Sequence, residues 1–125
     1  MAKEIINTEK APAAIGPYVQ GIKSNGILFM SGQLGFDMTD GSIPEAVEEQ
    51  AKNSLANLQA VMEAAGTDKS KVLKTTIFLT SMDDFAKVNE VYGAFFGEDK
   101  PARSCVAVAA LPKAAKVEIE CIVEA

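Results

Sequence analysis

The sequence contains no histidine, and this absence excludes more chemistry than any other feature of its composition. Without histidine, neither a Ser–His–Asp triad nor a Cys–His pair can form. A zinc site would have to combine two distant cysteines with carboxylates, which is an unusual ligand set. Any catalysis must therefore rest on carboxylates, arginine, lysine, tyrosine, serine, cysteine and backbone groups.

Cysteine is also scarce, because Cys105 and Cys121 are the only two and provide no disulfide framework. The first ten residues, "MAKEIINTEK", are polar and lack the apolar core of a signal peptide. No apolar run approaches the ~20 residues that a membrane helix needs. We therefore expect a cytoplasmic protein with reduced thiols and no membrane association.

Positive charge is the third scarce feature, since the net charge is -5 and the basic residues form no cluster in the sequence. Phosphate binding requires clustered lysine and arginine, so a nucleic-acid partner is disfavoured. The length of 125 residues is that of one domain, and we expect residues 1–125 to fold as a single unit.

Alternation of apolar residues and turn signals predict strands at both ends of the chain and in its middle. "SNG" at 24–26 predicts a tight turn between two strands. Together the patterns predict a strand at 3–7, a hairpin at 19–33, a loop at 34–44, a strand at 71–81, and two strands within 100–125 joined by "LPKAAK".

Two segments carry the spacing of amphipathic helices, at 45–65 and at 83–96. Pro44 favours the first turn of the first helix and Gly66 favours its end. Asp83 and Asp84 favour the start of the second helix through capping and the helix dipole, and Gly97 favours its end.

These elements predict the α+β class, with two helices packed on one face of a mixed sheet. The strands predicted near the C-terminus, however, are apolar on both faces, as in "SCVAVAAL". Strands of this kind are buried on both sides, and no third helix is available to cover the second face. We therefore expect a homo-oligomer, an expectation that fails if the protein sediments as a monomer at micromolar concentration.

Arg103 stands out because it opens the very apolar strand "SCVAVAAL", directly after Pro101. An arginine at a strand end is most often a surface residue, but one held in such a place needs an anion, and its planar fork fits a carboxylate. Glu118, in the last strand, is either on a solvated face with Glu120 or a general base. If the two terminal strands pair, or meet across an interface, Glu118 would lie near Arg103.

Three weaker signals accompany this pair. Cys105 has the same parity as Arg103, so both side chains are expected on one face, where Cys105 lines a pocket rather than acting as a nucleophile. Tyr18 follows the rigid "IGP" and either packs in the core or reaches a pocket. Ser31 and Gly32, in "MSGQ", lie at a strand end where backbone N–H groups can face a ligand.

Several motifs, in order along nearly the whole chain, are similar to those of the RidA/YjgF family of reactive-intermediate (imine/enamine) deaminases. They are "APAAIGPYVQG", "MSGQLG", "EEQAKNSLANLQAVMEAAG", "VLKTTIFLTSMDDFAKVNEVYGAFF" and the signature-like "PARSCVAVAALPKAAKVEIE".

The resemblance implies a chorismate-mutase-like (YjgF-like) fold, assembled as a homotrimer with a central barrel and sites at the subunit interfaces. It implies a hydrolase that converts 2-imino acids, such as 2-iminobutanoate and 2-iminopropanoate, to 2-keto acids and ammonia. It also implies that neither a metal nor an organic cofactor takes part.

The family's functional residues carry over onto positions of this sequence. The carboxylate-binding arginine falls on Arg103 and the water-positioning glutamate on Glu118 rather than Glu120, as the catalytic pair. The remaining substrate-binding positions that the resemblance implies are Tyr18, Ser31, Gly32, Asn89, Ser104 and Cys105.

Two departures from the family pattern bear on substrate preference: a short loop, "GEDKP", and alanine at position 107 where some relatives carry an acid. Two other functions stay open. One is an RNA-cleaving translation inhibitor, as some family members have been described. The other is a non-catalytic module that binds small carboxylates.

Overall fold

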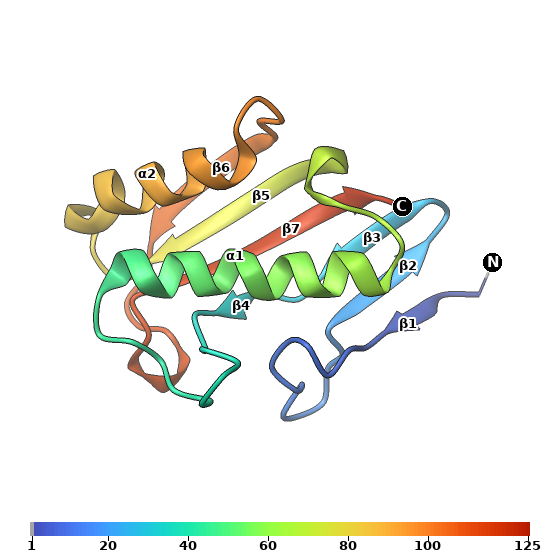
Figure 1. Cartoon of the computed structure of the whole chain (residues 1–125), viewed down its shortest axis with the longest axis horizontal. Coiled ribbons are helices and arrows are strands. Elements are labelled where there is room, and N and C mark those ends of the chain that lie inside the picture. The colour runs from blue at the N-terminus through green and yellow to red at the C-terminus, as the bar shows by residue number, and fades with distance from the viewer. Residues whose placement is uncertain (1) are drawn as a thin grey trace.

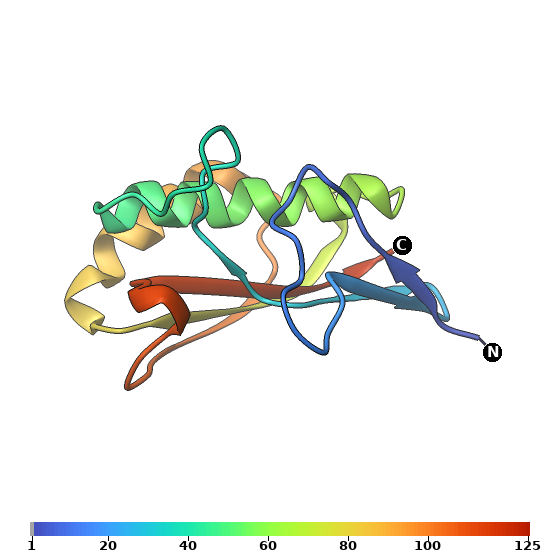
Figure 2. The same ribbon diagram turned by 90° about the horizontal axis from the view of Figure 1, so that it is seen from below.

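The computed structural model describes residues 2–125, which form one seven-stranded sheet with two helices on one face (Figures 1 and 2). In chain order the elements are β1 (Glu4–Ile6), β2 (Gly21–Ser24), β3 (Ile27–Met30), β4 (Gln33–Leu34), α1 (Val47–Ala64), the 3₁₀ turn η1 (Lys69–Lys71), β5 (Val72–Leu79), the 3₁₀ turn η2 (Met82–Asp84), α2 (Phe85–Phe96), β6 (Ala102–Ala107), the 3₁₀ turn η3 (Pro112–Ala114) and β7 (Val117–Glu124).

The strands lie in the order β1-β2-β3-β7-β5-β6, and β4 extends the line of β3 by pairing with β7. The pairs are antiparallel except for β5 and β6, which are parallel and are joined by α2. A parallel pair needs such a crossover, because the chain must return to the end of the sheet where the first strand began before the second strand can start. The α+β class and the mixed sheet that the sequence predicts are confirmed.

The hairpin between β2 and β3 closes at the predicted turn. Asn25 and Gly26 have φ angles of 51° and 78°, the left-handed pair that a two-residue hairpin loop requires. Ser24 then lies opposite Ile27, and the alternation of the two strands follows from that register.

The first helix begins later than its sequence suggests. Pro44 lies outside α1, and its carbonyl oxygen accepts a hydrogen bond of 2.8 Å from Nε2 of Gln50. The prediction that Pro44 occupies the first turn is therefore wrong, because a side chain from the helix binds its carbonyl instead. Gly66, with φ of 80°, ends the helix as predicted, since glycine adopts this backbone conformation without a steric penalty.

The second helix is preceded by η2, and its cap differs from the one predicted. Oγ of Ser81 accepts a hydrogen bond of 3.1 Å from the backbone N–H of Asp83, while Asp84 makes no capping bond with its side chain. Ser81 thus caps the turn η2, and α2 begins without a side-chain cap, so the predicted capping by the aspartates is wrong. Gly97, with φ of 59°, ends α2 as predicted.

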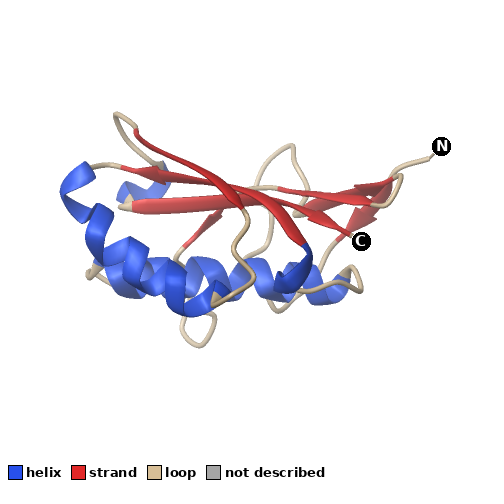
Figure 3. Ribbon diagram, turned by 90° about the horizontal axis from the view of Figure 1, so that it is seen from above, coloured by secondary structure: helices blue, strands red, loops and turns tan. Residues whose placement is uncertain are grey.

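The two faces of the sheet differ sharply (Figure 3). Both helices pack on one face, and between them and the sheet lies the core, which includes Leu28, Leu55, Leu58, Met62, Ile77, Leu79, Val88, Val117, Ile119 and Val123. The other side, which we call the open face, leaves Ile5 59% and Phe29 50% exposed. Within residues 2–125 no helix covers the open face, so its apolar surface lacks a partner in the single chain.

Strand β6 lies at the edge of the sheet, and five of its six residues are exposed. The sequence predicts that this strand is buried on both sides in an oligomer, and in the single chain it is exposed. Strand β5 also separates β6 from β7, so the two terminal strands do not pair. None of the helices in the described part of the chain is long and apolar enough to cross a membrane.

A candidate active site in two halves

A β-bulge separates β3 from β4. Phe29 lies opposite Ile122 and Gln33 lies opposite Ile119, so four steps along one strand match three along the other. The extra residue falls within 30–32. Bulges of this kind redirect side chains and backbone groups and are frequent beside active sites.

Gly32, in this bulge, lies against the carboxylate of Glu118. A Cβ added to Gly32 would lie 2.9 Å from Cδ of Glu118 and would overlap its Oε2. Only glycine leaves room for the carboxylate at this position. Burial raises the pKa of Glu118 above its ordinary value, and the negative charge of Glu120 raises it further.

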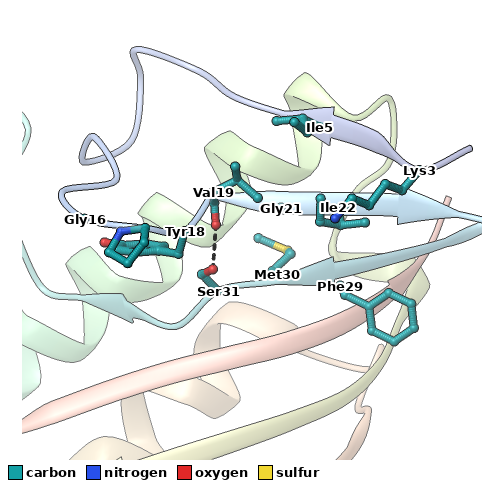
Figure 4. A pocket seen from close by; sticks show the side chains of 11 residues that line it. Lys3, Ile5, Gly16, Tyr18, Val19, Gly21, Ile22, Phe29, Met30 and Ser31 are labelled. Carbon is teal, nitrogen blue, oxygen red and sulfur yellow. Dashed lines mark hydrogen bonds between the residues drawn. The ribbon is translucent and has the colours of Figure 1, made fainter.

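Ser31 and Tyr18 flank the same bulge. Oγ of Ser31 donates a hydrogen bond of 2.6 Å to the carbonyl oxygen of Val19, which ties the bulge to the segment that carries Tyr18. The side chain of Tyr18 is half exposed. Tyr18 and Ser31 line one end of a pocket of ≈ 620 Å³ that continues over β1–β3 (Figure 4).

Gln20 holds this segment in place, and the sequence gives no indication of it. Its buried amide Nε2 donates to the carbonyl oxygens of Thr8 (3.0 Å) and Pro12 (2.8 Å), and its Oε1 accepts from the N–H of Thr8 (2.7 Å). Gln20 precedes β2, so the alternation of residues along the strand does not predict whether its side chain is buried or exposed. No sequence pattern therefore marks it as buried.

Arg103 lies on β6 and points to the helix side of the sheet, beside Thr75 of β5. Its Nη1 donates a hydrogen bond of 2.6 Å to Oδ1 of Asn89 in α2. Its Cζ lies 5.0 Å from the ring centroid of Tyr92 and 5.6 Å from that of Phe85. Among the described residues, Arg103 pairs with no carboxylate, so its positive charge is not neutralised.

Cys105 and Ser104 fall on opposite sides of β6. Cys105 lies beside Ile77, on the same face as Arg103, which confirms the shared face that the parity predicts. Burial raises the pKa of Cys105 more than the charge of Arg103 lowers it, so the thiol stays neutral and suits a lining role. Ser104 lies beside Thr76 and is on the open face.

Within one chain the predicted residues other than Ser104 thus form two separate groups. Tyr18, Ser31, Gly32 and Glu118 form what we call the Glu118 half-site, while Asn89, Arg103 and Cys105 form the Arg103 half-site. The first is on the open face and the second on the helix side, with β5 between their strands. One route that would bring Arg103 to Glu118, pairing of the terminal strands, is excluded. A meeting across an interface remains.

The sequence reasoning missed the aromatic surroundings of Arg103. The amphipathic spacing over 83–96 predicts a helix with an apolar face, but it does not link the aromatic residues of that face to the arginine. A signal was present, because Phe85, Asn89 and Tyr92 have the i, i+4, i+7 spacing that places them on one side of a helix. Within residues 2–125, no three His, Cys, Asp or Glu side chains are grouped so that they could hold a metal ion.

The sequence is similar to known proteins over nearly its whole length. The family model described as Endoribonuclease L-PSP matches residues 8–125. A Salmonella typhimurium protein named 2-iminobutanoate/2-iminopropanoate deaminase is 51% identical over 94% of this chain and 94% of its own length. The chloroplastic Reactive Intermediate Deaminase A of Arabidopsis thaliana is 50% identical over 96% of this chain, a match that spans 65% of the plant protein.

A solved structure agrees with these matches over the whole fold. The crystal structure of Escherichia coli TdcF with bound serine superposes with a TM-score of 0.94, at 47% sequence identity, and the match covers 98% of both chains. The sequence similarity and the shared fold extend over both halves of the candidate site. The chain therefore belongs to the RidA/YjgF family.

Proposed function

We propose that the protein hydrolyses small 2-imino acids, such as 2-iminobutanoate and 2-iminopropanoate, to 2-keto acids and ammonia. The observation that carries this proposal is the setting of Arg103, which is the only arginine in the sequence. A neutral amide and two aromatic rings hold its guanidinium while no carboxylate neutralises it. Such a group suits the carboxylate of a small acid, and the names of the relatives indicate the same chemistry.

Glu118 supplies the second function that the reaction needs. Its carboxylate accepts a proton from a water molecule, and the water oxygen bonds to the imine carbon. For the protonated imine this step gives a carbinolamine, and Glu118 passes the proton to its nitrogen. The C–N bond then breaks, ammonia leaves, and the hydroxyl proton returns to the Glu118 carboxylate as the carbonyl forms. A raised pKa improves a carboxylate as a base at neutral pH, and positioning supplies the remaining rate gain without a covalent intermediate.

The complete site is formed where two copies of the chain meet in a homotrimer. The two half-sites of one chain are on opposite faces, so a neighbouring copy brings its Arg103 to the Glu118 of the first. The apolar open face and the exposed edge strand β6 support such an assembly. The family resemblance supports three copies around a central barrel.

The activity is tested by generating 2-iminobutanoate in the reaction mixture and following its loss. We expect acceleration by the protein and a loss of about 10²-fold with Arg103→Ala. Arg103→Lys is also impaired, because an ammonium group cannot form two parallel hydrogen bonds with a carboxylate. Lys52→Ala, which removes a positive charge from α1, is the control. Full activity of Arg103→Ala would show that the proposed carboxylate clamp is wrong.

The interfacial site is tested by mixing two inactive variants, Arg103→Ala and Glu118→Ala, under conditions that allow subunit exchange. If each site takes Arg103 and Glu118 from different copies, random mixing restores roughly one quarter of the wild-type activity. If both residues come from the same chain, no mixed trimer contains an intact site. Persistent inactivity after confirmed exchange would therefore refute the interfacial arrangement.

RNA cleavage is the second activity to test, because the description of the family model names an endoribonuclease. The net charge of -5 and the absence of histidine disfavour it. RNA cleavage that is absent from a mock purification and disappears with Arg103→Ala would favour this function. Binding of 2-ketobutyrate without acceleration of imine loss would instead favour a carboxylate-binding module.

A further inference from the structure

We infer that Tyr92, tethered by Thr75, is a positioning residue that holds Arg103 ready for its substrate, an inference that rests on the proposed function. Thr75 and Tyr92 are both buried, and their hydroxyl oxygens lie 2.6 Å apart. Thr75 is also the residue of β5 that lies beside Arg103 in the register of β5 and β6. The same threonine therefore fixes the tyrosine ring relative to the strand that carries the arginine.

The ring of Tyr92 supports the guanidinium from the helix side. Cζ of Arg103 is 5.0 Å from the centroid of this ring, within the ≈ 6 Å range of cation–π attraction. Phe85 provides a second ring at 5.6 Å, and it lies two helical turns from Tyr92 on the same side of α2. The attraction to a ring face neutralises no charge, unlike a carboxylate, so the arginine keeps its affinity for an anion.

Asn89, between the two aromatic residues on α2, restricts the rotation of the guanidinium between the rings. It accepts a hydrogen bond from Nη1 only, at 2.6 Å, and the other N–H donors stay available to a carboxylate. A free arginine side chain carries about 2 kcal/mol of rotamer entropy, which binding would otherwise have to remove. An arginine that is already fixed binds its anion more tightly, because this cost is met during folding.

The test separates the ring of Tyr92 from its hydroxyl group. Tyr92→Leu removes the ring, and we expect KM for the imine to rise roughly 3- to 30-fold while kcat changes less. Tyr92→Phe retains the ring and brings KM back toward the wild-type value. This variant is nevertheless less stable to urea, because the buried hydroxyl of Thr75 loses its partner.

Phe95→Leu is the matched control on the same helix. The ring of Phe95 faces Lys69, with Nζ 4.9 Å from its centroid, rather than Arg103. It should lower stability without raising KM. An equal rise in KM with Phe95→Leu, or an unchanged KM with Tyr92→Leu, would overturn the inference. If Tyr92→Leu does not fold, Phe85→Leu decides, because the ring of Phe85 is only partly buried and its loss should still raise KM.

A second measurement does not depend on turnover. Because the sequence has one arginine, the side-chain Nε–H signal of Arg103 is unique in an NMR spectrum. We expect it to show a rigid side chain in the wild type and a mobile one in Tyr92→Leu, without substrate. A mobile wild-type arginine would refute the inference. A rigid arginine in a protein that does not accelerate imine loss would refute the proposed function alone.

Discussion

At the scale of single residues, the turn η3 contains an unusual backbone. Lys113 and Ala114 have φ angles of 61° and 54°, the left-handed conformation, which costs a residue with a Cβ roughly 1–2 kcal/mol. Lys113 lines a pocket of ≈ 300 Å³ together with Tyr18 and Gly32. The strained turn is therefore next to the Glu118 half-site, where strain is often retained for function.

Replacing Ala114 by glycine should raise the free energy of unfolding by about 0.5–1 kcal/mol, since the steric penalty disappears while the unfolded chain gains entropy. Urea denaturation measures the change. Ala115→Gly is the control, because Ala115 has φ of -67° and is buried, so the same replacement should destabilise. Destabilisation by Ala114→Gly would mean that the left-handed backbone is not strained.

The proximity of Glu118 and Glu120 predicts a pH effect on activity. Glu118 acts as a carboxylate, so activity falls as the pH drops through its pKa, which burial and then Glu120 raise. Removing the charge with Glu120→Gln lowers that pKa, and the acid limb of kcat/KM should move to lower pH. Glu124→Gln, farther along the same strand, should leave the limb in place. A shift to higher pH with Glu120→Gln would contradict this account.

At the scale of elements, the sequence predicts turns and helix ends, because these depend on the conformation of a few neighbouring residues. The turn at Asn25 and Gly26 and the ends of both helices at Gly66 and Gly97 follow from backbone conformations that the sequence alone favours. The sequence predicts no separate strand at β4, whose residues fall at the end of the predicted hairpin and the start of the predicted loop. The strand exists only through pairing with β7, far along the chain. Neither its register nor the bulge before it has a local cause.

The N-terminal segment 7–19 contains no helix or strand and depends on Gln20 instead. Gln20→Leu removes all the hydrogen bonds of this side chain and leaves the N–H of Thr8 without its partner, so we expect a loss of about 2–4 kcal/mol in the free energy of unfolding. Freed residues near Lys10 should also become sensitive to trypsin. Asn53→Leu, which removes a single bond of 3.2 Å to the carbonyl of Gly35, is the control.

Unchanged cleavage at Lys10 in Gln20→Leu would show that other contacts hold the segment. Activity gives an independent check, because this segment carries Tyr18 to the Glu118 half-site. We expect the variant to lose activity beyond what its lower stability explains, measured at a temperature where it remains folded.

At the scale of the whole molecule, the sequence identified the members of the candidate site better than their arrangement. Arg103 and Glu118 stood out by their chemistry and by the family resemblance. Their separation could not be predicted, because it depends on β5 inserting between β6 and β7, which is set by non-local pairing. The sequence predicts an assembly, and the exposed apolar residues of the open face indicate which surface would be buried in it.

Phe29→Glu should convert the proposed trimer to monomers at micromolar concentration, measured by sedimentation velocity. Phe29 is half exposed on the open face, and burial of its exposed half by a neighbouring copy contributes about 1 kcal/mol per subunit, which a charge would reverse. Met38→Glu, at an exposed position on the loop before α1, is the control. A wild-type protein that sediments as a monomer would refute the assembly itself.

The exposed edge strand β6 affects the solubility of the single chain before it assembles. Unpaired edges of apolar strands promote aggregation, and proteins commonly protect them with a charged gatekeeper residue. Arg103 is the only charged residue in β6, so it fills this role as well as the role proposed for it in binding. Arg103→Ala therefore removes the clamp and the gatekeeper together, whereas Arg103→Lys keeps the charge and isolates the loss of binding.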